Sequence, residues 1–177
     1  ESHGGSGLGS LANSAVVIEF ARACASTAVT ISVHAGLATA AVLLYGNDEQ
    51  KRRYLPRLAS GEWLGAYSLS EEGSGSDAAG LRCAATPDGE GGYVLDGTKL
   101  WGTSGDQADL IVVFARTSNE SRSKGITAFL VETAWPGFRA GKKERKVGIR
   151  GSSTTEIRFE GLKVPASNVL GEVNKGF

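Results

Sequence analysis

The hydrophobic pattern of this 177-residue chain changes near residue 62. From Ala15 to Tyr45, Ala, Val, Leu and Ile recur at spacings of three and four residues, which is typical of helices. After residue 62 the apolar residues come in short runs that are bounded by turn residues, and 18 of the 25 glycines lie there. The pattern predicts a helical domain over residues 1–62 and a β-domain over residues 63–177.

A membrane-spanning helix is one interpretation of residues 23–45, because this stretch contains no Asp, Glu, Lys or Arg. Hydroxyl side chains, His34 and Gly36 interrupt it, however, and its many small residues suit close packing. We therefore expect two packed helices, separated near residues 27–30 or at Gly36, and no membrane span. His34 is interpreted as a packed or half-exposed helix residue rather than as a catalytic group.

A further helix is predicted to begin after Asn47. Asn is a favourable N-cap residue, and Asp48 and Glu49 place negative charge at the positive end of the helix dipole. Gly61 is predicted to end this helix, because glycine is the usual residue just beyond a helix C-terminus.

The second part contains strand signals with no helical pattern between them. Residues 110–115 and 126–131 are short apolar runs rich in β-branched and aromatic side chains, whereas residues 157–164 alternate apolar with charged side chains. Residues 93–95 lie between the turn-forming pairs Asp88-Gly89 and Asp96-Gly97. We therefore expect an α+β fold, in which a helical segment precedes an antiparallel β-sandwich or barrel.

Charge and cysteine content exclude several classes of function. The 19 basic residues balance the 19 acidic ones, which argues against a nucleic acid or anionic membrane partner bound by bulk electrostatics. Cys24 and Cys83 are too few for a disulfide framework, and with two histidines they show no metal-ligand spacing, so no metal site is expected. The basic residues between 139 and 150 are interpreted as a solvated hairpin rim, with phosphate binding as the alternative.

Two segments carry chemistry that a bound heterocycle requires. Residues 67–77 follow an apolar strand and combine glycines with small hydroxyl side chains, so their backbone N–H groups can form a cradle for a phosphate or a polar ring edge. In residues 99–105, Trp101 offers a flat apolar face next to the hydroxyl of Thr103. A flexible surface loop is the alternative for the first segment.

These segments resemble the flavin-binding segments of the acyl-CoA dehydrogenase family, typically written L/M/V-T-E-P-x-A-G-S-D and W/F-I-T. Further motifs similar to those of the family follow in the same order, at residues 45–51, 54–61, 147–156, 164–165 and 168–171. The chain thus resembles the later part of the family's amino-terminal helical domain followed by its middle β-domain, closest to short-chain and branched-chain members. The family's carboxy-terminal helical domain is absent from this sequence, and we expect the natural chain to extend beyond both ends.

The resemblance implies FAD as the cofactor and assigns roles to individual positions. Leu69 and Ser70 would contact the pyrimidine edge of the flavin, Trp101 would lie against the ring, and Thr103 would donate towards N5. Ser76 would approach both the FAD pyrophosphate and the acyl-CoA. The complete set of implied cofactor contacts is Tyr67, Leu69, Ser70, Gly75, Ser76, Trp101, Gly102 and Thr103, and the implied substrate contacts are Ser76, Ser123 and Lys124.

Three positions depart from the family pattern. Ser70 stands where Thr is usual, which keeps the hydroxyl group but loses the stiffening methyl group. Glu72 replaces the usual Pro, so we expect a turn that is less fixed in conformation. Gly102 replaces Ile, which we expect to loosen the wall beside Trp101.

The resemblance implies α,β-dehydrogenation of acyl-CoA thioesters, with electrons passed to an electron-transfer flavoprotein. In relatives the catalytic glutamate comes from the carboxy-terminal helical domain, so no catalytic residue is assigned here and this chain alone is expected to be inactive. The resemblance also implies a homotetramer, cytoplasmic in a bacterium or in the mitochondrial matrix of a eukaryote. The alternatives are a non-enzymatic β-rich binding module and an acyl-CoA oxidase or flavin monooxygenase on the same scaffold.

Overall fold

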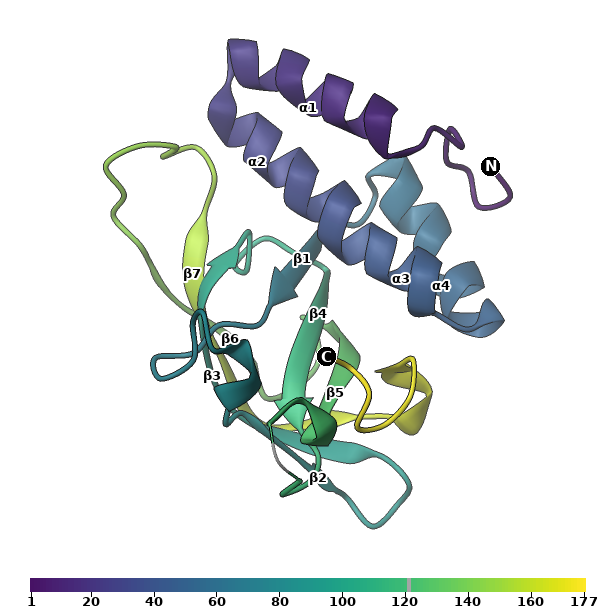
Figure 1. Ribbon diagram of the computed structural model, residues 1–177, viewed down its shortest axis with the longest axis vertical. Coiled ribbons are helices and arrows are strands. Elements are labelled where there is room, and N and C mark those ends of the chain that lie inside the picture. The colour runs from purple at the N-terminus through teal and green to yellow at the C-terminus, as the bar shows by residue number, and fades with distance from the viewer. Residues whose placement is uncertain (121) are drawn as a thin grey trace.

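The computed structural model describes residues 1–120 and 122–177, and the α-helices among them all precede the strands (Figure 1). Helix α1 runs antiparallel to the helical run that follows it, and helix α4 lies behind that run (Figure 1). The bounds are α1 Ser10–Ala23, α2 Ala25–Val33, a π-helical segment His34–Thr39, α3 Ala40–Tyr45 and α4 Asp48–Ser60.

The break in the apolar helical stretch lies at Cys24, so the positions predicted for it are wrong. Cys24 has extended backbone angles, whereas residues 25–45 are helical throughout. Gly36 falls inside the π-helical segment, where the Thr39 hydroxyl donates to the His34 carbonyl at 2.7 Å. Because polar side chains here bond to carbonyls of their own helix, they do not interrupt it.

The run Ala25–Tyr45 is long and apolar enough to cross a membrane by length and composition alone, with a mean hydropathy of 1.7. Three of its side chains, Ala28, Ala38 and Val42, are buried within the protein. Ala38 and Val42 pack in one apolar cluster with residues of α4 and of the sheet. The absence of a membrane span stays a prediction.

Helix α4 begins and ends at the predicted residues. The Asn47 side chain accepts from the Gln50 backbone N–H at 2.9 Å, and the Gln50 side chain accepts from the Asn47 N–H at 3.0 Å. This reciprocal capping box satisfies two N–H groups that a helix start leaves free. Gly61 follows the helix in the left-handed conformation, at φ 76°.

The strands of the described residues form one eight-stranded sheet, in the order β6-β7-β3-β2-β4-β5-β8 with β1 beside β4. Most pairs are antiparallel as predicted, but β4 pairs in parallel with β1 and, at one residue, with β2. The bounds are β1 Gly65–Ser68, β2 Ala84–Pro87, β3 Tyr93–Thr103, β4 Leu110–Arg116, β5 Ile126–Glu132, β6 Phe138–Lys143, β7 Thr154–Val164 and β8 Val169–Leu170.

Strand β3 is longer than predicted because Asp96-Gly97 is not a turn. The register against β7 shifts at this pair, which marks an irregularity within a continuous strand. A side chain at position 97 would place its Cβ 2.9 Å from the Cα of Cys83, and the glycine there has φ 147°. Glycine therefore permits β3 to pass close to the chain just before β2.

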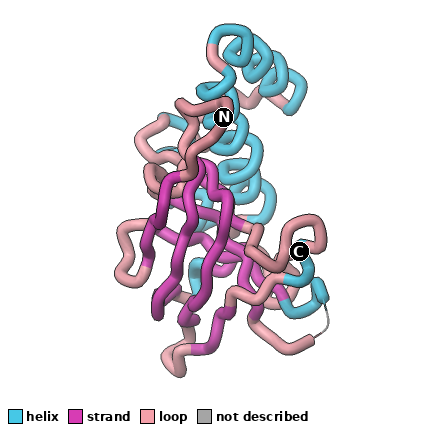
Figure 2. The backbone as a smooth tube through the Cα atoms, turned by 90° about the vertical axis from the view of Figure 1, so that its left-hand side faces the viewer, coloured by secondary structure: helices cyan, strands magenta, loops and turns pink. Residues whose placement is uncertain are grey.

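Strands β4 and β5 are buried on both faces, which explains their continuous apolar runs. One face belongs to an inner core, where the sheet folds upon itself and residues of β4 and β5 meet residues of β3 and β7. Tyr93 of β3, for example, contacts Phe129 of β5 edge to face, with ring centroids 5.3 Å apart. The other face belongs to an interlayer core that the sheet shares with the helices (Figure 2).

His34 joins the helices to the first strand. Its Nε2 lies 3.0 Å from the Leu58 carbonyl, and its Nδ1 accepts from the Gly65 N–H at 2.9 Å. Since Nδ1 is an acceptor here, Nε2 carries the hydrogen and donates the hydrogen bond to the Leu58 carbonyl. A Cβ at position 65 would lie 2.7 Å from that of Ala38, so only glycine lets β1 approach the helix this closely.

Gln50 provides the first test of how the helices are attached to the β-region. Its side chain is buried, and its amide nitrogen donates to the carbonyls of Ser167 and Val169 at 2.8 and 2.7 Å. In Gln50→Glu the capping oxygen remains, but a carboxylate faces both carbonyls. We expect a loss of about 3 kcal/mol in unfolding free energy at pH 7, measured by urea denaturation.

The loss in Gln50→Glu should shrink below about pH 5, because protonation of the new carboxyl restores one donor. Glu49→Gln is the control, since Glu49 is exposed in the same helical turn and its change should cost less than about 1 kcal/mol. Equal stability of Gln50→Glu and the parent protein would contradict the role of the two amide bonds.

Candidate functional site

The first predicted segment begins on strand β1 and continues as a loop. Tyr67 is half-buried and its ring packs against Phe114, with centroids 5.1 Å apart; burial raises the pKa of its phenol. Leu69 and Ser70 are also half-buried, whereas Gly75 and Ser76 are exposed. The segment therefore starts in the protein interior and emerges at the surface.

A tight turn shapes the middle of this loop. The backbone groups of Glu71 and Ser74 exchange two hydrogen bonds, of 2.9 and 3.1 Å. The buried Ser74 hydroxyl donates to the carbonyl of Asp77 at 2.9 Å and lies 3.3 Å from that of Ala78. The exposed residue Glu72 thus lies in a turn that hydrogen bonds hold closed even without the proline of the family pattern.

The second predicted segment ends strand β3, where the register against β7 shifts between Lys99 and Gly102. Trp101 has φ 62°, a left-handed conformation that is strained for a bulky residue. Its side chain is 60% exposed despite its size. The irregularity therefore leaves a large aromatic side chain at the surface, and the half-buried Thr103 follows two residues later.

The expectation that Gly102 loosens the wall beside Trp101 is wrong. Gly102 is buried, and a Cβ at this position would lie 2.6 Å from Cδ1 of Ile157. A side chain here would point into the inner core, where Ile157 already fills the space. Glycine at 102 therefore changes the packing beneath the strand and not the surface next to the indole.

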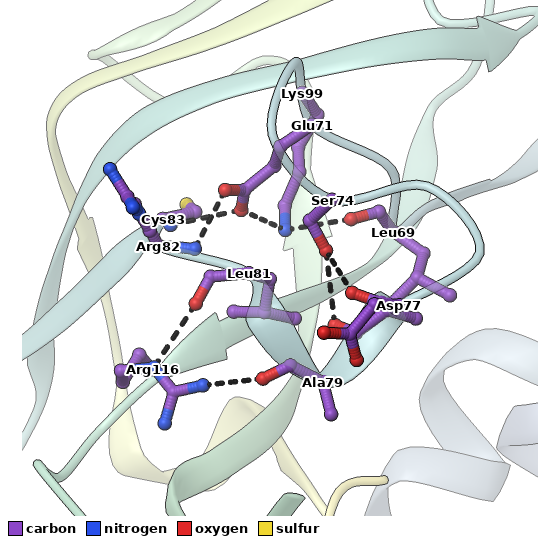
Figure 3. A network of polar contacts seen from close by, with 11 residues as sticks. Leu69, Glu71, Ser74, Asp77, Ala79, Leu81, Arg82, Cys83, Lys99 and Arg116 are labelled. Carbon is purple, nitrogen blue, oxygen red and sulfur yellow. Dashed lines mark hydrogen bonds and ion pairs between the residues drawn. The ribbon is translucent and has the colours of Figure 1, made fainter. Parts of the chain in front are cut away.

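The two predicted segments lie together because of a polar network (Figure 3). The Leu100 N–H donates to the Ser70 carbonyl at 2.8 Å. The ammonium group of Lys99 donates to the Leu69 carbonyl at 3.0 Å and to the Glu71 carboxylate at 2.8 Å. The sequence analysis assigned no role of their own to Lys99 and Glu71. The position of Lys99 on the inward-facing side of its strand, between Leu95 and Gly102, could have indicated a buried and paired lysine.

Ser123 and Lys124 lie in a 3-10 turn, Arg122–Gly125, between β4 and β5. This turn packs beside another one, Ala78–Gly80, which directly follows the first predicted segment. Arg116 bridges the region, since its guanidinium donates to the carbonyls of Ala79, Leu81 and Glu120. Ser123 and Lys124 therefore lie near the end of residues 67–77. Figure 3 shows the bonds from Arg116 to the carbonyls of Ala79 and Leu81.

One buried hydroxyl group without a hydrogen-bond partner lies in the first segment, and another lies opposite the second segment on β7. Among the described residues, the buried hydroxyl groups of this kind are Ser68, Ser152, Ser153 and Thr155. Ser68 directly precedes Leu69, and Thr155 pairs with Gly102 across the β3–β7 ladder. Buried polar groups normally have a partner, so unmatched hydroxyls at these two places leave hydrogen-bonding capacity next to the predicted site.

An apolar cavity of about 430 Å³ adjoins the first segment. Tyr67, Leu69 and Phe114 line it from the sheet, and Ala41 and Tyr45 line it from the helical run. Its walls are mostly apolar, with Lys175 as the one charged side chain among the described residues that line it, and such walls suit a ligand with a hydrophobic part.

Within residues 1–120 and 122–177, no group of three or more His, Cys, Asp or Glu side chains is arranged to hold a metal ion. Part of the basic cluster already has partners inside the protein. Arg139 pairs with Glu160, and the ammonium group of Lys146 donates to Ser152 and Thr154. These contacts favour the interpretation of the cluster as a hairpin rim.

The fold has two parts, a helical layer and a curled, mostly antiparallel sheet on which it packs. An exposed Trp and a glycine- and serine-rich turn form a candidate site for a planar ligand at the ends of the strands. Residues 1–62 match the family description "Acyl-CoA dehydrogenase, N-terminal domain", and residues 66–162 match "Acyl-CoA dehydrogenase, middle domain". The chain belongs to the acyl-CoA dehydrogenase family.

Individual relatives agree with this assignment. An acyl-CoA dehydrogenase of Bacillus subtilis is 44% identical over 177 residues, which are 100% of this chain and 46% of the relative. The mitochondrial isovaleryl-CoA dehydrogenase of Pongo abelii is 44% identical over 98% of this chain and 41% of its own length. The chain therefore spans less than half the length of these curated relatives.

The fold agrees with a solved structure as well. The acyl-CoA dehydrogenase of Bacillus anthracis, solved in complex with FAD, superposes with a TM-score of 0.92 at 40% sequence identity. The similarity covers 99% of this chain and 29% of that protein chain. It includes both the helices and the sheet, so the arrangement of the two parts is similar to that of a solved relative.

The two cysteines test the burial of the site region. Burial raises the pKa of the Cys83 thiol to about 12, whereas a hydrogen bond with the Thr27 side chain lowers the pKa of the exposed Cys24 thiol. Because the thiolate is the nucleophile, we expect a disulfide reagent at pH 8 to label one thiol of the native protein, Cys24.

Cys24→Ser should abolish this labelling, and the second thiol should react only after denaturation. Fast labelling of native Cys24→Ser would contradict the buried position of Cys83 next to the polar network.

Proposed function

We propose that the protein is an FAD-dependent acyl-CoA dehydrogenase, and that residues 67–76 and 101–103 form part of its flavin site. The observation that carries this proposal is the convergence of two segments, more than 20 residues apart in the sequence, through the bonds from Leu100 to Ser70 and from Lys99 to Leu69. The FAD-bound relative supports the cofactor.

The residues present fit a flavin. An exposed indole offers a stacking face, and the half-buried hydroxyls of Ser70 and Thr103 offer hydrogen bonds to ring heteroatoms. Nothing lies within 4 Å of a Cβ built at Gly73 or Gly75, so the backbone of the turn is open to a ligand. A bulky residue in a strained conformation is typical of a functional site.

In this proposal each segment has its own task. Trp101 packs against the ring, and Leu69, Ser70 and Thr103 bind its polar edge and exclude water from it. Gly75 and Ser76 approach the pyrophosphate, and Ser76, Ser123 and Lys124 contact the CoA part of the substrate. When bound, FAD supplies the acceptor for the hydride that leaves the β-carbon of the acyl group.

The Glu71 carboxylate, which lies within the proposed site, is not available as a base for the α-proton. The Glu71 carboxylate is held by the Lys99 ammonium group and by two backbone N–H groups, those of Arg82 and Cys83. A general base requires a free carboxylate within reach of its proton. We therefore propose that the catalytic glutamate lies outside these 177 residues, as the family resemblance implies.

The same proposal extends to organisation and partners. We infer a helical domain over residues 1–62 and a β-domain over residues 63–177, which the separate family matches support. An acyl-CoA is the substrate, an electron-transfer flavoprotein the electron acceptor and a homotetramer the assembly. The compartment is the cytoplasm in a bacterium or the mitochondrial matrix in a eukaryote, and the helix Ala25–Tyr45 packs within the protein rather than in a membrane.

Trp101→Ala tests the flavin site directly. Loss of the stacking face should raise the dissociation constant for FAD about tenfold, measured by quenching of flavin fluorescence. Unfolding of the apoprotein should change by less than about 1 kcal/mol, because the side chain is largely exposed. Val147→Ala, at an almost fully exposed position of the β6–β7 loop, is the control.

Unchanged FAD affinity in Trp101→Ala would contradict the proposed contact between the indole and the flavin. If the parent protein retains no FAD at all, a non-enzymatic β-rich module becomes the better description.

Because we place the catalytic base outside these 177 residues, we expect that the 177-residue chain alone does not oxidise acyl-CoA. With added FAD, butyryl-CoA or isovaleryl-CoA and an electron-accepting dye, dye reduction should not exceed that of a sample without protein. Turnover by this chain would contradict the assignment of the base to a residue elsewhere.

A further inference from the structure

Strand β3 carries a charged side chain at a fully buried position, and protein interiors rarely hold a lysine there unless it is paired. Lys99 has no solvent exposure, and its ammonium group lies 2.8 Å from the Glu71 carboxylate, whose side chain is 10% exposed. A buried lysine without a partner would be strongly unfavourable, so Lys99 and Glu71 depend on one another.

The Glu71 carboxylate connects three parts of the chain at once. It accepts from Lys99 on β3, and it accepts from the backbone N–H groups of Arg82 and Cys83, at 2.6 and 2.9 Å, just before β2. Glu71 itself belongs to the turn of residues 71–74 (Figure 3). Movement of the turn would therefore break charge-assisted bonds to β3 and to the residues just before β2.

The contacts of Lys99 lie directly beside the residues that the proposed function places on the flavin. Lys99 is two residues before Trp101, and it donates to the carbonyl of Leu69. The next residue of each segment continues the connection, since the Leu100 N–H donates to the Ser70 carbonyl. The spacing between the two segments is thus set within one or two residues of their proposed ligand contacts.

The conformation of Trp101 also needs support from its surroundings. A left-handed backbone at a large residue persists only where neighbouring contacts determine it. On the side before Trp101 that support comes from Lys99 and Leu100, and on the side after it from the Ser104 N–H, which donates to the Ser153 carbonyl at 2.9 Å.

We propose that the buried Lys99–Glu71 ion pair is a positioning device that holds the 67–76 and 101–103 segments in their flavin-binding arrangement. The inference rests on the proposed function and deepens it. Neither residue acts on substrate; both are positioning residues that act through Leu69, Ser70 and Trp101.

The test uses the full-length protein and separates positioning from stability. Lys99→Met and Glu71→Gln each leave one buried group without its charged partner, so both flavin affinity and thermal stability should fall. The double variant Glu71→Gln/Lys99→Met removes both charges and keeps a side-chain oxygen for the Cys83 N–H. Because the double variant leaves no buried charge without its partner, its apoprotein should unfold at a higher temperature than that of either single variant.

The dissociation constant for FAD, from quenching of flavin fluorescence, is compared with the unfolding temperature of each apoprotein. We expect the double variant to bind FAD at least about tenfold more weakly than the parent and to shift the visible absorption band of the bound flavin. Lys163→Met is the matched control, because Lys163 is exposed on β7 and lies 3.9 Å from its partner Glu90. Its flavin affinity should be unchanged.

Glu71→Asp provides a second variant that retains both charges. It withdraws the carboxylate by one methylene group, so the protein should fold while the affinity for FAD falls by about threefold or more. Parent-like affinity and an unshifted flavin band in Glu71→Asp or in the double variant would overturn the positioning role. Failure of the parent protein to bind FAD would instead contradict the proposed function, and the positioning role with it.

Discussion

The burial of strand β4 on both of its faces is the constraint on which the rest of the structure depends. Alternate residues of this strand contribute to the inner core and to the interlayer core. Strand β1 pairs with it in parallel and leads into the first predicted segment. The hydrophobic contacts of this one strand determine both the curl of the sheet and the position of the helices on it. The orientation of the site therefore follows from the same packing.

Polar contacts, by comparison, determine the places where separate chain segments meet. His34 joins a helix to β1, Gln50 joins α4 to the last residues of the sheet, and Lys99 joins β3 to the glycine- and serine-rich loop. In each case a buried or half-buried side chain bonds to backbone carbonyl or N–H groups of a distant segment. Apolar packing is not directional, so these bonds add the register and spacing that it does not specify.

The candidate site combines a strained, exposed aromatic residue with a rigidly held turn. Trp101 lies at the surface because β3 changes register, and the turn of residues 71–74 stays closed without a proline. The departure at Gly102 is accommodated inside the protein by Ile157. The departures from the family pattern at Glu72 and Gly102 therefore change the contacts beneath and within the site more than its exposed surface.

The sequence alone determined the succession of helices and strands, the cap at Asn47, the end of α4 at Gly61 and membership of the family. These features depend on local periodicity, on capping chemistry and on motifs, which can be read along the chain. Propensity did not locate the helix break, since Thr30 and Thr39 bond within the helix instead of ending it.

Only the tertiary structure decided the parallel pairing of β1 with β4, the inward position of Gly102 and the burial of Lys99 against Glu71. Each of these depends on which residues meet across long sequence separations. Local patterns do not encode that information. A buried charge or a buried glycine is favourable only because of a contacting residue that lies elsewhere in the chain.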